Sequence, residues 1–301
     1  MPIAHSDLDT FFTYPILSPA LERQWQMEKL RFDNLDQYLL LKNGNYLYKI
    51  PYQNGFAVLK LYYDSRGWLE RIGKTLDNLI VMGQTSFMPR SRLRTEQRAL
   101  RIWREAGFRV FRVYEDVEVE GLPKGGYALY EYVPGRNFHK LLPDESVPLE
   151  DRIRFYRIFL DQWHRRHKMA VEKSEPRLIH ENGDIKHVME YNGELVWFDF
   201  EMCFRSRFHV EDLVSREILA YVKSLADFLP PERFELFFNE TMLVYPGREF
   251  LANTHTVLFN NRNPFIRLAR RLDFRFRKRS RKPSSKYNMA LKIRQWLEQH
   301  P

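Results

Sequence analysis

Short runs of alternating apolar and polar residues fill the first part of the chain, and turn residues separate them. The runs at 38–42, 46–50 and 56–63 are separated by the turns 43–45 and 53–55, and each turn contains Asn-Gly. Asn-Gly between alternating runs is the strongest short-range signal for a β-hairpin. The pattern therefore predicts a small antiparallel sheet of three strands joined by tight turns.

Elsewhere the apolar residues recur at helical spacing. This spacing predicts helices at 21–30, 65–93, 95–106, 149–167, 210–225 and 231–245. Gly107 ends the third of these, as glycine commonly ends a helix. Strands are predicted at 111–114, 117–120 and 127–133. His164 and His167 lie near the end of the helix 149–167, where cations are favoured, so we expect them to be helix-end cations rather than zinc ligands.

A second hairpin lies in the middle of the chain and carries a high density of polar side chains. It comprises a loop and strand at 178–189, a turn at Asn192-Gly193 and a strand at 195–201. Asp184 and His187 lie in the loop, and Asp199 ends the second strand. Phosphoryl transfer needs such groups, with one carboxylate on the attacking hydroxyl and others holding Mg²⁺. The alternative is a surface hairpin with solvated charges.

The hairpin resembles the catalytic segment of the protein-kinase-like superfamily. Asp199-Phe200-Glu201 is similar to Asp-Phe-Gly, and His187-Val188-Met189 is similar to the Asn-Ile-Leu that ends the catalytic loop. The resemblance is to the branch of aminoglycoside and choline kinases and the kinases of bacterial lipopolysaccharide core sugars. The last of these carry His at the position of His187. The resemblance implies an α+β, two-lobed fold that uses ATP and Mg²⁺, with Asp199 and His187 at the metal.

The catalytic loop fits this family pattern in two registers. Without a gap, His180-Glu181-Asn182 falls on His-Arg-Asp, so that Asn182 occupies the position of the catalytic base. Asn cannot accept a proton as a carboxylate does. With a loop two residues shorter, Asp184 is the base, and the need for a carboxylate favours this register. Asp212, at the start of the following helix, resembles the Asp that braces the loop.

A lysine and a glutamate upstream resemble the ion pair that holds ATP phosphates in kinases. Lys60 ends the apolar run Ala57-Val-Leu-Lys, which is similar to Val-Ala-Ile-Lys. A buried amine needs anionic partners, and Glu96 lies on the apolar side of the helix 95–106. Glu105 and Glu70 are rival partners, and an exposed lysine is the alternative for Lys60. The first turn carries only Gly44, where kinases have a glycine-rich loop over the phosphates.

Tyr127–Gly135 resembles the hinge between kinase lobes. The resemblance implies that the backbone of Glu131 and Val133 pairs with adenine. We accordingly divide the chain into an N-terminal extension (1–35), a sheet-rich lobe (36–133) and a helical lobe (134–301).

The cysteine content indicates a reducing compartment, and the C-terminal region contains a basic segment. Cys203 is the single cysteine, so the chain can form no internal disulfide and no zinc site of several cysteines. We expect a cytoplasmic protein, since no apolar run is long enough to span a bilayer. Between Arg262 and Lys286 eleven cations accompany one acid, Asp273, and aromatic and aliphatic residues are interleaved with them. This segment predicts peripheral binding to an anionic membrane surface, with nucleic acid as second choice and a packed basic helix as the alternative.

The sequence thus predicts an ATP- and Mg²⁺-dependent kinase that acts on a hydroxyl of a sugar or glycolipid related to the lipopolysaccharide core. A pseudokinase that serves as a regulatory or assembly scaffold is the first alternative, suggested by Asn182 and Gly44. A protein Ser/Thr kinase is the second, and the absence of an Ala-Pro-Glu-like segment after Asp199 argues against it.

Overall fold

The structure is a computed structural model that describes residues 27–42, 44–63, 85–86 and 88–301. The predicted helix 65–93 falls mainly outside the described residues. Most of the predicted helix 21–30 does so too, but its last residues, Glu28–Leu30, form strand β1 rather than a helix. β1 lies parallel to β6, Val117–Val119.

A five-stranded antiparallel sheet forms the N-terminal part of the molecule, in the order β2-β3-β4-β7-β5. Its strands are β2 (Leu39–Lys42), β3 (Tyr46–Tyr52), β4 (Gly55–Leu61), β7 (Tyr127–Glu131) and β5 (Val113–Tyr114). Tyr48, Ile50 and Tyr52 alternate into the core along β3, as the period of two predicts. Gly44 has a φ of +72°, a conformation that glycine adopts at little cost in the turn before β3.

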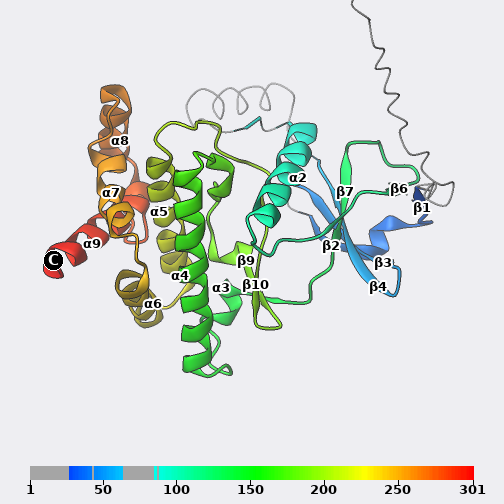
Figure 1. Ribbon diagram of the computed structural model, residues 1–301, viewed down its shortest axis with the longest axis horizontal. Coiled ribbons are helices and arrows are strands. Elements are labelled where there is room, and N and C mark those ends of the chain that lie inside the picture. Colours follow the sequence, from blue (N-terminus) through cyan, green and yellow to red (C-terminus); the bar gives the residue numbers. More distant parts are fainter. Residues whose placement is uncertain (1–26, 43, 64–84, 87) are drawn as a thin grey trace, which may run out of the picture.

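One long helix, α2 (Pro89–Glu105), packs beside this sheet (Figure 1). It begins six residues before the predicted start at Thr95, because Pro89 in its first turn favours initiation there. Leu93, Ala99 and Trp103 are buried on its inner side. Gly107, with a φ of +82°, follows its end as predicted.

The second hairpin is present as predicted and lies between the sheet and the helices. It consists of β9 (Val188–Tyr191) and β10 (Glu194–Trp197), and β8 (Arg136–Asn137) pairs with β9. Asn192 and Gly193 both have positive φ, which is the backbone of a two-residue type I′ turn.

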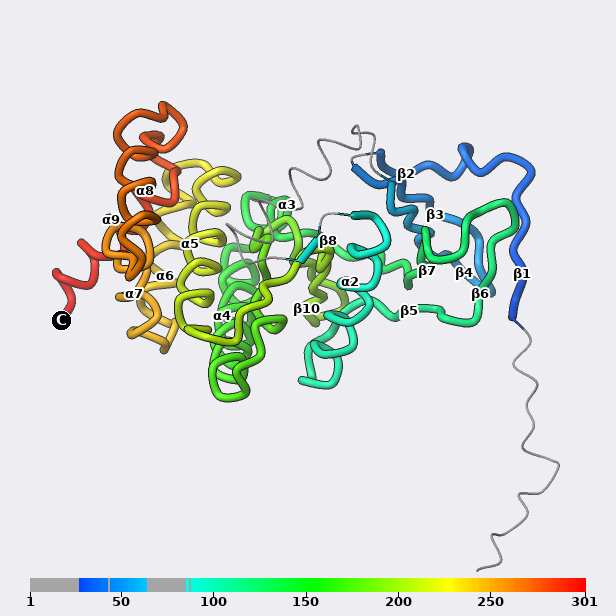
Figure 2. Tube along the Cα trace, turned by 90° about the horizontal axis from the view of Figure 1, so that it is seen from above, coloured from blue at the N-terminus to red at the C-terminus, as the bar shows by residue number. Residues whose placement is uncertain are grey.

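The C-terminal part is mainly helical, and Figure 2 shows it at the opposite end of the molecule from the sheet. Its helices are α3 (Phe138–Leu141), α4 (Leu149–Glu172), α5 (Val210–Phe228), α6 (Pro231–Val244), α7 (Arg248–Phe259), α8 (Pro264–Phe276) and α9 (Lys286–Gln299). Short 3-10 turns lie at η2 (Leu35–Tyr38), η4 (Pro176–Leu178), η5 (Ile185–His187) and η6 (Lys278–Arg281). No helix of the described residues is long and apolar enough to cross a membrane.

Aromatic packing joins the two parts. The ring centroid of Trp103 on α2 lies 4.5 Å from that of Phe200 and 5.6 Å from that of Trp197 on β10. The Trp197 ring in turn stacks on Phe159 of α4 at 5.3 Å. The α+β class and the two-part arrangement predicted from the sequence are confirmed, and this core fixes α2 and the hairpin relative to one another.

Candidate active site

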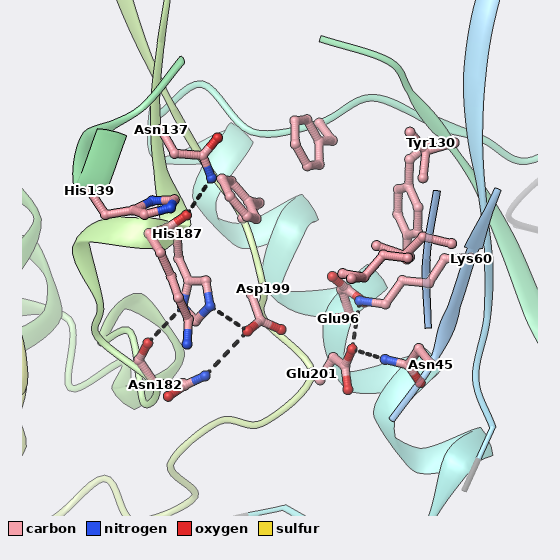
Figure 3. Close-up of a pocket in the computed structure, with 16 residues that line it drawn as sticks. Asn45, Lys60, Glu96, Tyr130, Asn137, His139, Asn182, His187, Asp199 and Glu201 are labelled. Atoms are coloured by element: carbon pink, nitrogen blue, oxygen red, sulfur yellow. Dashed lines mark hydrogen bonds and ion pairs between the residues drawn. The ribbon is translucent and has the colours of Figure 1, made fainter. Parts of the chain in front are cut away.

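A cavity of about 500 Å³ lies between the sheet, α2 and the hairpin. This volume is within the usual range of about 300–1,000 Å³ for small-molecule sites. One group of its lining residues is apolar: Leu41, Leu47, Val58, Phe111, Tyr130 and Phe198. The other group is polar: Asn45, Lys60, Glu96, Asn137, His139, Asn182, Lys186, His187, Asp199 and Glu201. Figure 3 shows that the polar side chains gather in two clusters on opposite sides of the cavity.

The first cluster is centred on Lys60. Its Nζ lies 2.7 Å from Glu96 Oε2, so Lys60 is paired with the predicted glutamate and is neither exposed nor paired with Glu105. Glu70, the other rival partner, lies outside the described residues. Burial alone would lower the pKa of Lys60, but the charges of Glu96 and Glu201 outweigh it and hold that pKa above the usual range. Tyr62 donates to Glu96 as well. The ammonium is therefore charged and held at the cavity wall.

Glu201 belongs to the same cluster, which the sequence did not predict. Its Oε1 lies 2.7 Å from Lys60 Nζ, and its Oε2 lies 2.9 Å from Arg92 Nη1. Asn45, from the turn before β3, also donates to Glu201. Glu201 therefore ties the end of the hairpin to the sheet and to α2. In the sequence, only the glutamate in place of the usual glycine after Asp199-Phe200 marked this position as unusual. Its partners could not be identified, because they lie in distant parts of the chain.

The second cluster is centred on Asp199. His187 Nε2 lies 3.0 Å from Asp199 Oδ2, and Asn182 Nδ2 donates to the same oxygen at 3.2 Å. Burial alone would raise the pKa of Asp199, but the hydrogen bond from His187 and the charges of His187 and Lys60 hold it well below its usual range. Asp199 has a φ of +72°, a strained conformation for a residue other than glycine. The surrounding contacts thus hold an ionised carboxylate towards the cavity.

The loop before the hairpin is fixed by His180. Its Nε2 donates to the backbone carbonyl of Asp199 at 3.1 Å, and its Nδ1 accepts from Tyr221 OH at 2.8 Å. These roles suit a neutral ring, and burial followed by the charge of His187 lowers the pKa of His180 to about 4. Because Asn182 lines the cavity and Asp184 does not, the geometry favours the register without a gap.

The expected brace of this loop, Asp212, is not its partner. Glu217 accepts from the backbone N–H of His180 at 3.1 Å, whereas Asp212 accepts from Asn253 at 3.0 Å. Glu217 lies on the inner side of α5, one and a half turns further along, so its side chain reaches the loop.

Glu217 also corrects the prediction for His167. Glu217 Oε2 lies 3.0 Å from Arg166 Nη1 and 3.2 Å from His167 Nε2. His167 is fully buried, and this burial lowers its pKa to about 4, so the ring is neutral. The prediction of a helix-end cation was wrong, because α4 continues to Glu172 and places His167 inside the core.

Asp184, the favoured catalytic base, is not among the described residues that line the cavity. Its Oδ1 accepts from the backbone of Lys186 at 2.9 Å and from Ser224 Oγ at 2.7 Å. Its other oxygen lies 3.3 Å from Lys186 Nζ. Asp184 therefore caps η5 and holds Lys186, which does line the cavity. This geometry does not support the predicted role of Asp184 as base.

The residues predicted to hold adenine lie near the cavity but do not line it. Tyr130, one residue before Glu131, is the lining residue of this segment. The backbone N–H of Glu131 donates to the carbonyl of Arg112 at 2.9 Å and is not available to a ligand, while Val133 is buried. Gly44 is also absent from the lining, and its neighbour Asn45 faces the cavity instead.

The donor set at Asp199 fits Mg²⁺ bound together with phosphates, rather than a metal held by protein alone. No group of three or more His, Cys, Asp or Glu among the described residues could hold a metal ion. Mg²⁺ is usually bound by one or two carboxylates plus waters and substrate phosphates. Asp199 supplies such a carboxylate, and His187 Nε2 beside it is a weaker ligand for a hard cation.

Comparison with known proteins finds no matching family model and no matching curated protein. Among solved structures, the chain is similar to WaaP in complex with acyl carrier protein, with 15% identity and a TM-score of 0.40 over 77% of this chain and 87% of that chain. It is also similar to the Rio2 kinase from Chaetomium thermophilum in its ADP/Mg²⁺-phosphoaspartate complex, with 13% identity and a TM-score of 0.39 over 86% and 70%. A choline/ethanolamine kinase family protein from Mesorhizobium loti matches with 11% identity and a TM-score of 0.36 over 85% and 90%.

Proposed function

We propose that this protein is an ATP- and Mg²⁺-dependent phosphotransferase whose acceptor is a hydroxyl of a sugar or glycolipid. The observation that carries the proposal is that the Lys60–Glu96 pair and the ionised Asp199 line the same cavity (Figure 3). The two clusters are supplied by segments far apart in the chain, β4 with α2 and the end of the hairpin. Phosphoryl transfer depends on positioning and on charge stabilisation, and this cavity offers both signs of charge.

On one wall, Lys60 would bind nucleotide phosphates, and Glu96 would fix its orientation. Glu201 holds the same ammonium at 2.7 Å, so phosphate binding would share or replace this contact. The apolar side chains of Val58, Leu47 and Tyr130 offer a surface for the flat face of a nucleobase.

On the other wall, Asp199 and His187 would hold Mg²⁺, which supplies charge neutralisation at the phosphates when bound. Asn182 donates to Asp199 and lines the cavity, so it positions groups there without acting as a base. Lys186, held by Asp184, adds a positive charge to this side of the cavity.

The acceptor class is supported by the polar side chains at the edge of the cavity. Asn137, His139 and Lys186 line it next to the catalytic loop. Side chains that donate and accept hydrogen bonds suit the hydroxyls of a sugar, and the lysine suits an anionic substituent. The resemblance of the loop to lipopolysaccharide kinases, with His187 in the place of Asn, agrees with such an acceptor.

The test is to supply the protein with ATP, Mg²⁺ and defined acceptors, and to follow both ADP and new phosphomonoester by ³¹P NMR. Lipopolysaccharide core oligosaccharide, choline, an aminoglycoside and a Ser/Thr peptide would compare the acceptor classes. We expect phosphate on the oligosaccharide in the wild type and none with Asp199→Asn. Phosphate on the peptide or on choline instead would overturn the acceptor class.

A pseudokinase is the second candidate, because the side chain at the base position is Asn182 and Asp184 lies outside the cavity. This candidate predicts that Mg²⁺ and ATP bind without formation of phosphomonoester on any acceptor. Binding and turnover measured on the same sample therefore separate the two functions.

A further inference from the structure

The helix α8 forms an exposed apolar stripe that nothing in the described structure covers. None of its residues, all of which the structure describes, is buried. It is nevertheless a defined helix, since Asn263 Oδ1 accepts from the backbone of Phe265 at 2.9 Å and Pro264 occupies its first turn. It lies at the outer edge of the helical part (Figures 1 and 2).

Its apolar residues divide into an inner and an outer set. On the inner side Phe274 packs on Phe259 and Tyr287, with ring centroids 5.8 Å and 5.1 Å apart. Asp273 accepts from Tyr287 OH at 2.9 Å and fastens the same side to α9. The outer set, here called the α8 stripe, consists of Phe265, Leu268, Leu272 and Phe276, which are 80%, 56%, 47% and 68% exposed.

The α8 stripe follows the helical period. Its members are separated by three, four and four residues, a spacing that places them along one side of a helix. Large apolar side chains gathered in this way on a surface mark an interaction site. Because Phe274 and Asp273 contact α7 and α9, the α8 stripe faces away from these two helices.

Positive charge borders the α8 stripe on one side. Arg271 and Arg275 are exposed beside it on the helix, and further exposed cations follow at Arg277, Lys278, Arg279, Arg281 and Lys282. Eleven cations and one acid occupy residues 262–286 as a whole. An apolar stripe next to cationic side chains is typical of a helix that lies in the interface of an anionic bilayer.

We propose that α8 lies in the headgroup region of an anionic membrane, with the α8 stripe inserted among the lipid chains and the arginines on the headgroups. A second copy of the chain is a poorer occupant, because a symmetric contact would place these arginines against one another. Nucleic acid attracts the same charges but offers no counterpart to four large apolar side chains, since its interfaces are polar.

The described structure also connects this surface with the cavity. Phe208 is 82% exposed, and the next residue, His209, accepts from Arg262 Nη1 at 2.7 Å, just before α8 begins. Phe208 lies nine residues after Asp199 in the segment between β10 and α5. Docking of α8 would therefore bring the segment that leaves the cavity close to the lipid surface.

The test uses the full chain and sedimentation with vesicles of phosphatidylcholine alone or mixed with phosphatidylglycerol. We expect the wild type to sediment only with the mixed vesicles, and more weakly at 1 M salt because the Debye length falls to about 3 Å. The stripe variant, Phe265→Asn with Phe276→Asn, should lose at least about tenfold in partition. Leu243→Asn, which alters a 69% exposed leucine on α6, should not change it.

Charge is tested with Arg271→Glu and Arg275→Glu together, against Arg101→Glu and Lys173→Glu on other exposed surfaces. Only the first pair should abolish binding, although both pairs change net charge equally. Phe265→Trp should show a blue shift of emission on the mixed vesicles, which reports insertion. Thermal unfolding in the absence of lipid should be unchanged in all variants, as their side chains are exposed.

Equal losses in both charge pairs would show a general charge effect and overturn the proposal. Unchanged binding of the stripe variant would reject insertion, and tighter binding of duplex DNA than of vesicles at matched salt would identify nucleic acid instead. Loss of a dimer in the stripe variant would identify a second copy as the occupant. Vesicle binding needs no nucleotide, so its outcome is independent of the proposed catalytic function.

Discussion

At the residue scale, the loop that contains Asn182 poses the sharpest question, because the family resemblance predicts a carboxylate at a position where the chain has an amide. Asn182 faces the cavity, and its amide donates to Asp199 at 3.2 Å. An aspartate at this position would be able to accept the proton of an acceptor hydroxyl. The residue present instead can only position groups through its amide.

We therefore predict that Asn182→Asp raises turnover of the sugar acceptor, by up to about 10²–10⁴, the usual contribution of a positioned base. The measurement is the initial rate of phosphomonoester formation at saturating ATP. A lower rate in this variant would mean that the amide itself, through its bond to Asp199, is the group on which the chemistry depends.

Asp184→Asn is the matched variant in the same loop. Asn caps a helix about as well as Asp and can still accept from Ser224, so we expect an unchanged fold. Turnover should fall by less than about tenfold, through weaker positioning of Lys186. A loss of about 10²–10⁴ would restore Asp184 as the base.

At the element scale, one buried carboxylate links α4, α5 and the segment that leads into the catalytic loop. Glu217 pairs with Arg166, accepts from Trp163 Nε1 at 3.1 Å and accepts from the backbone of His180 at 3.1 Å. Glu217 and Arg166 are both fully buried, so the pair depends on its internal hydrogen bonds. The position of the loop therefore depends on a contact formed far from the cavity.

We predict that Glu217→Gln lowers the free energy of unfolding by about 3–5 kcal/mol, because it leaves the Arg166 charge buried without its partner. Glu211→Gln on the exposed side of the same helix should change it by less than about 0.5 kcal/mol. Urea unfolding of the two variants gives this comparison. Similar values for both would show that the buried pair is not needed for stability.

His167, in the same network, makes stability depend on pH. Burial lowers its pKa to about 4, whereas an unfolded histidine titrates near about 6.5. Between these values the unfolded chain binds more protons than the folded one, so stability falls as the pH falls. We predict that His167→Gln makes this slope shallower, by up to about 1.4 kcal/mol per pH unit between pH 4.5 and 6.

The control for this prediction is His300→Gln, which alters an exposed histidine near the end of the chain. It should leave the pH dependence of the unfolding free energy unchanged. An equal slope in His167→Gln and the wild type would mean that the imidazole of His167 is charged in the folded protein.

At the scale of the whole molecule, local signals predicted most of the elements. The strand pairs β2–β3, β3–β4 and β9–β10 all form where the three predicted Asn-Gly turns place them, because the conformation of a tight turn is set by two or three neighbouring residues. The pair of Lys60 and Glu96 was also predicted, since each lies on the apolar side of its own element and needs an opposite charge.

Contacts between distant segments could not be predicted in the same way. The bonds of Glu201 to Asn45 and Arg92 bring together positions more than one hundred residues apart. The brace of the catalytic loop was assigned to Asp212 rather than Glu217, because the sequence shows which residues share a helix face but not how far the loop lies along the helix. The position of Asp184 could not be predicted for the same reason. Its carboxylate accepts a hydrogen bond from Ser224 on α5 and does not line the cavity.

The proposed function requires that the cavity bind ATP together with Mg²⁺ between Lys60 and Asp199, and thermal unfolding with millimolar ATP measures this binding. We predict that ATP raises the Tm of the wild type modestly without Mg²⁺ and more with it, since a ligand that binds only the folded state stabilises that state by mass action. Asp199→Asn should keep the effect of ATP and lose the Mg²⁺ increment, and Lys60→Met should weaken both. An unchanged Tm in the wild type with ATP and Mg²⁺, or a full Mg²⁺ increment in Asp199→Asn, would rule out binding of ATP and Mg²⁺ between these two side chains.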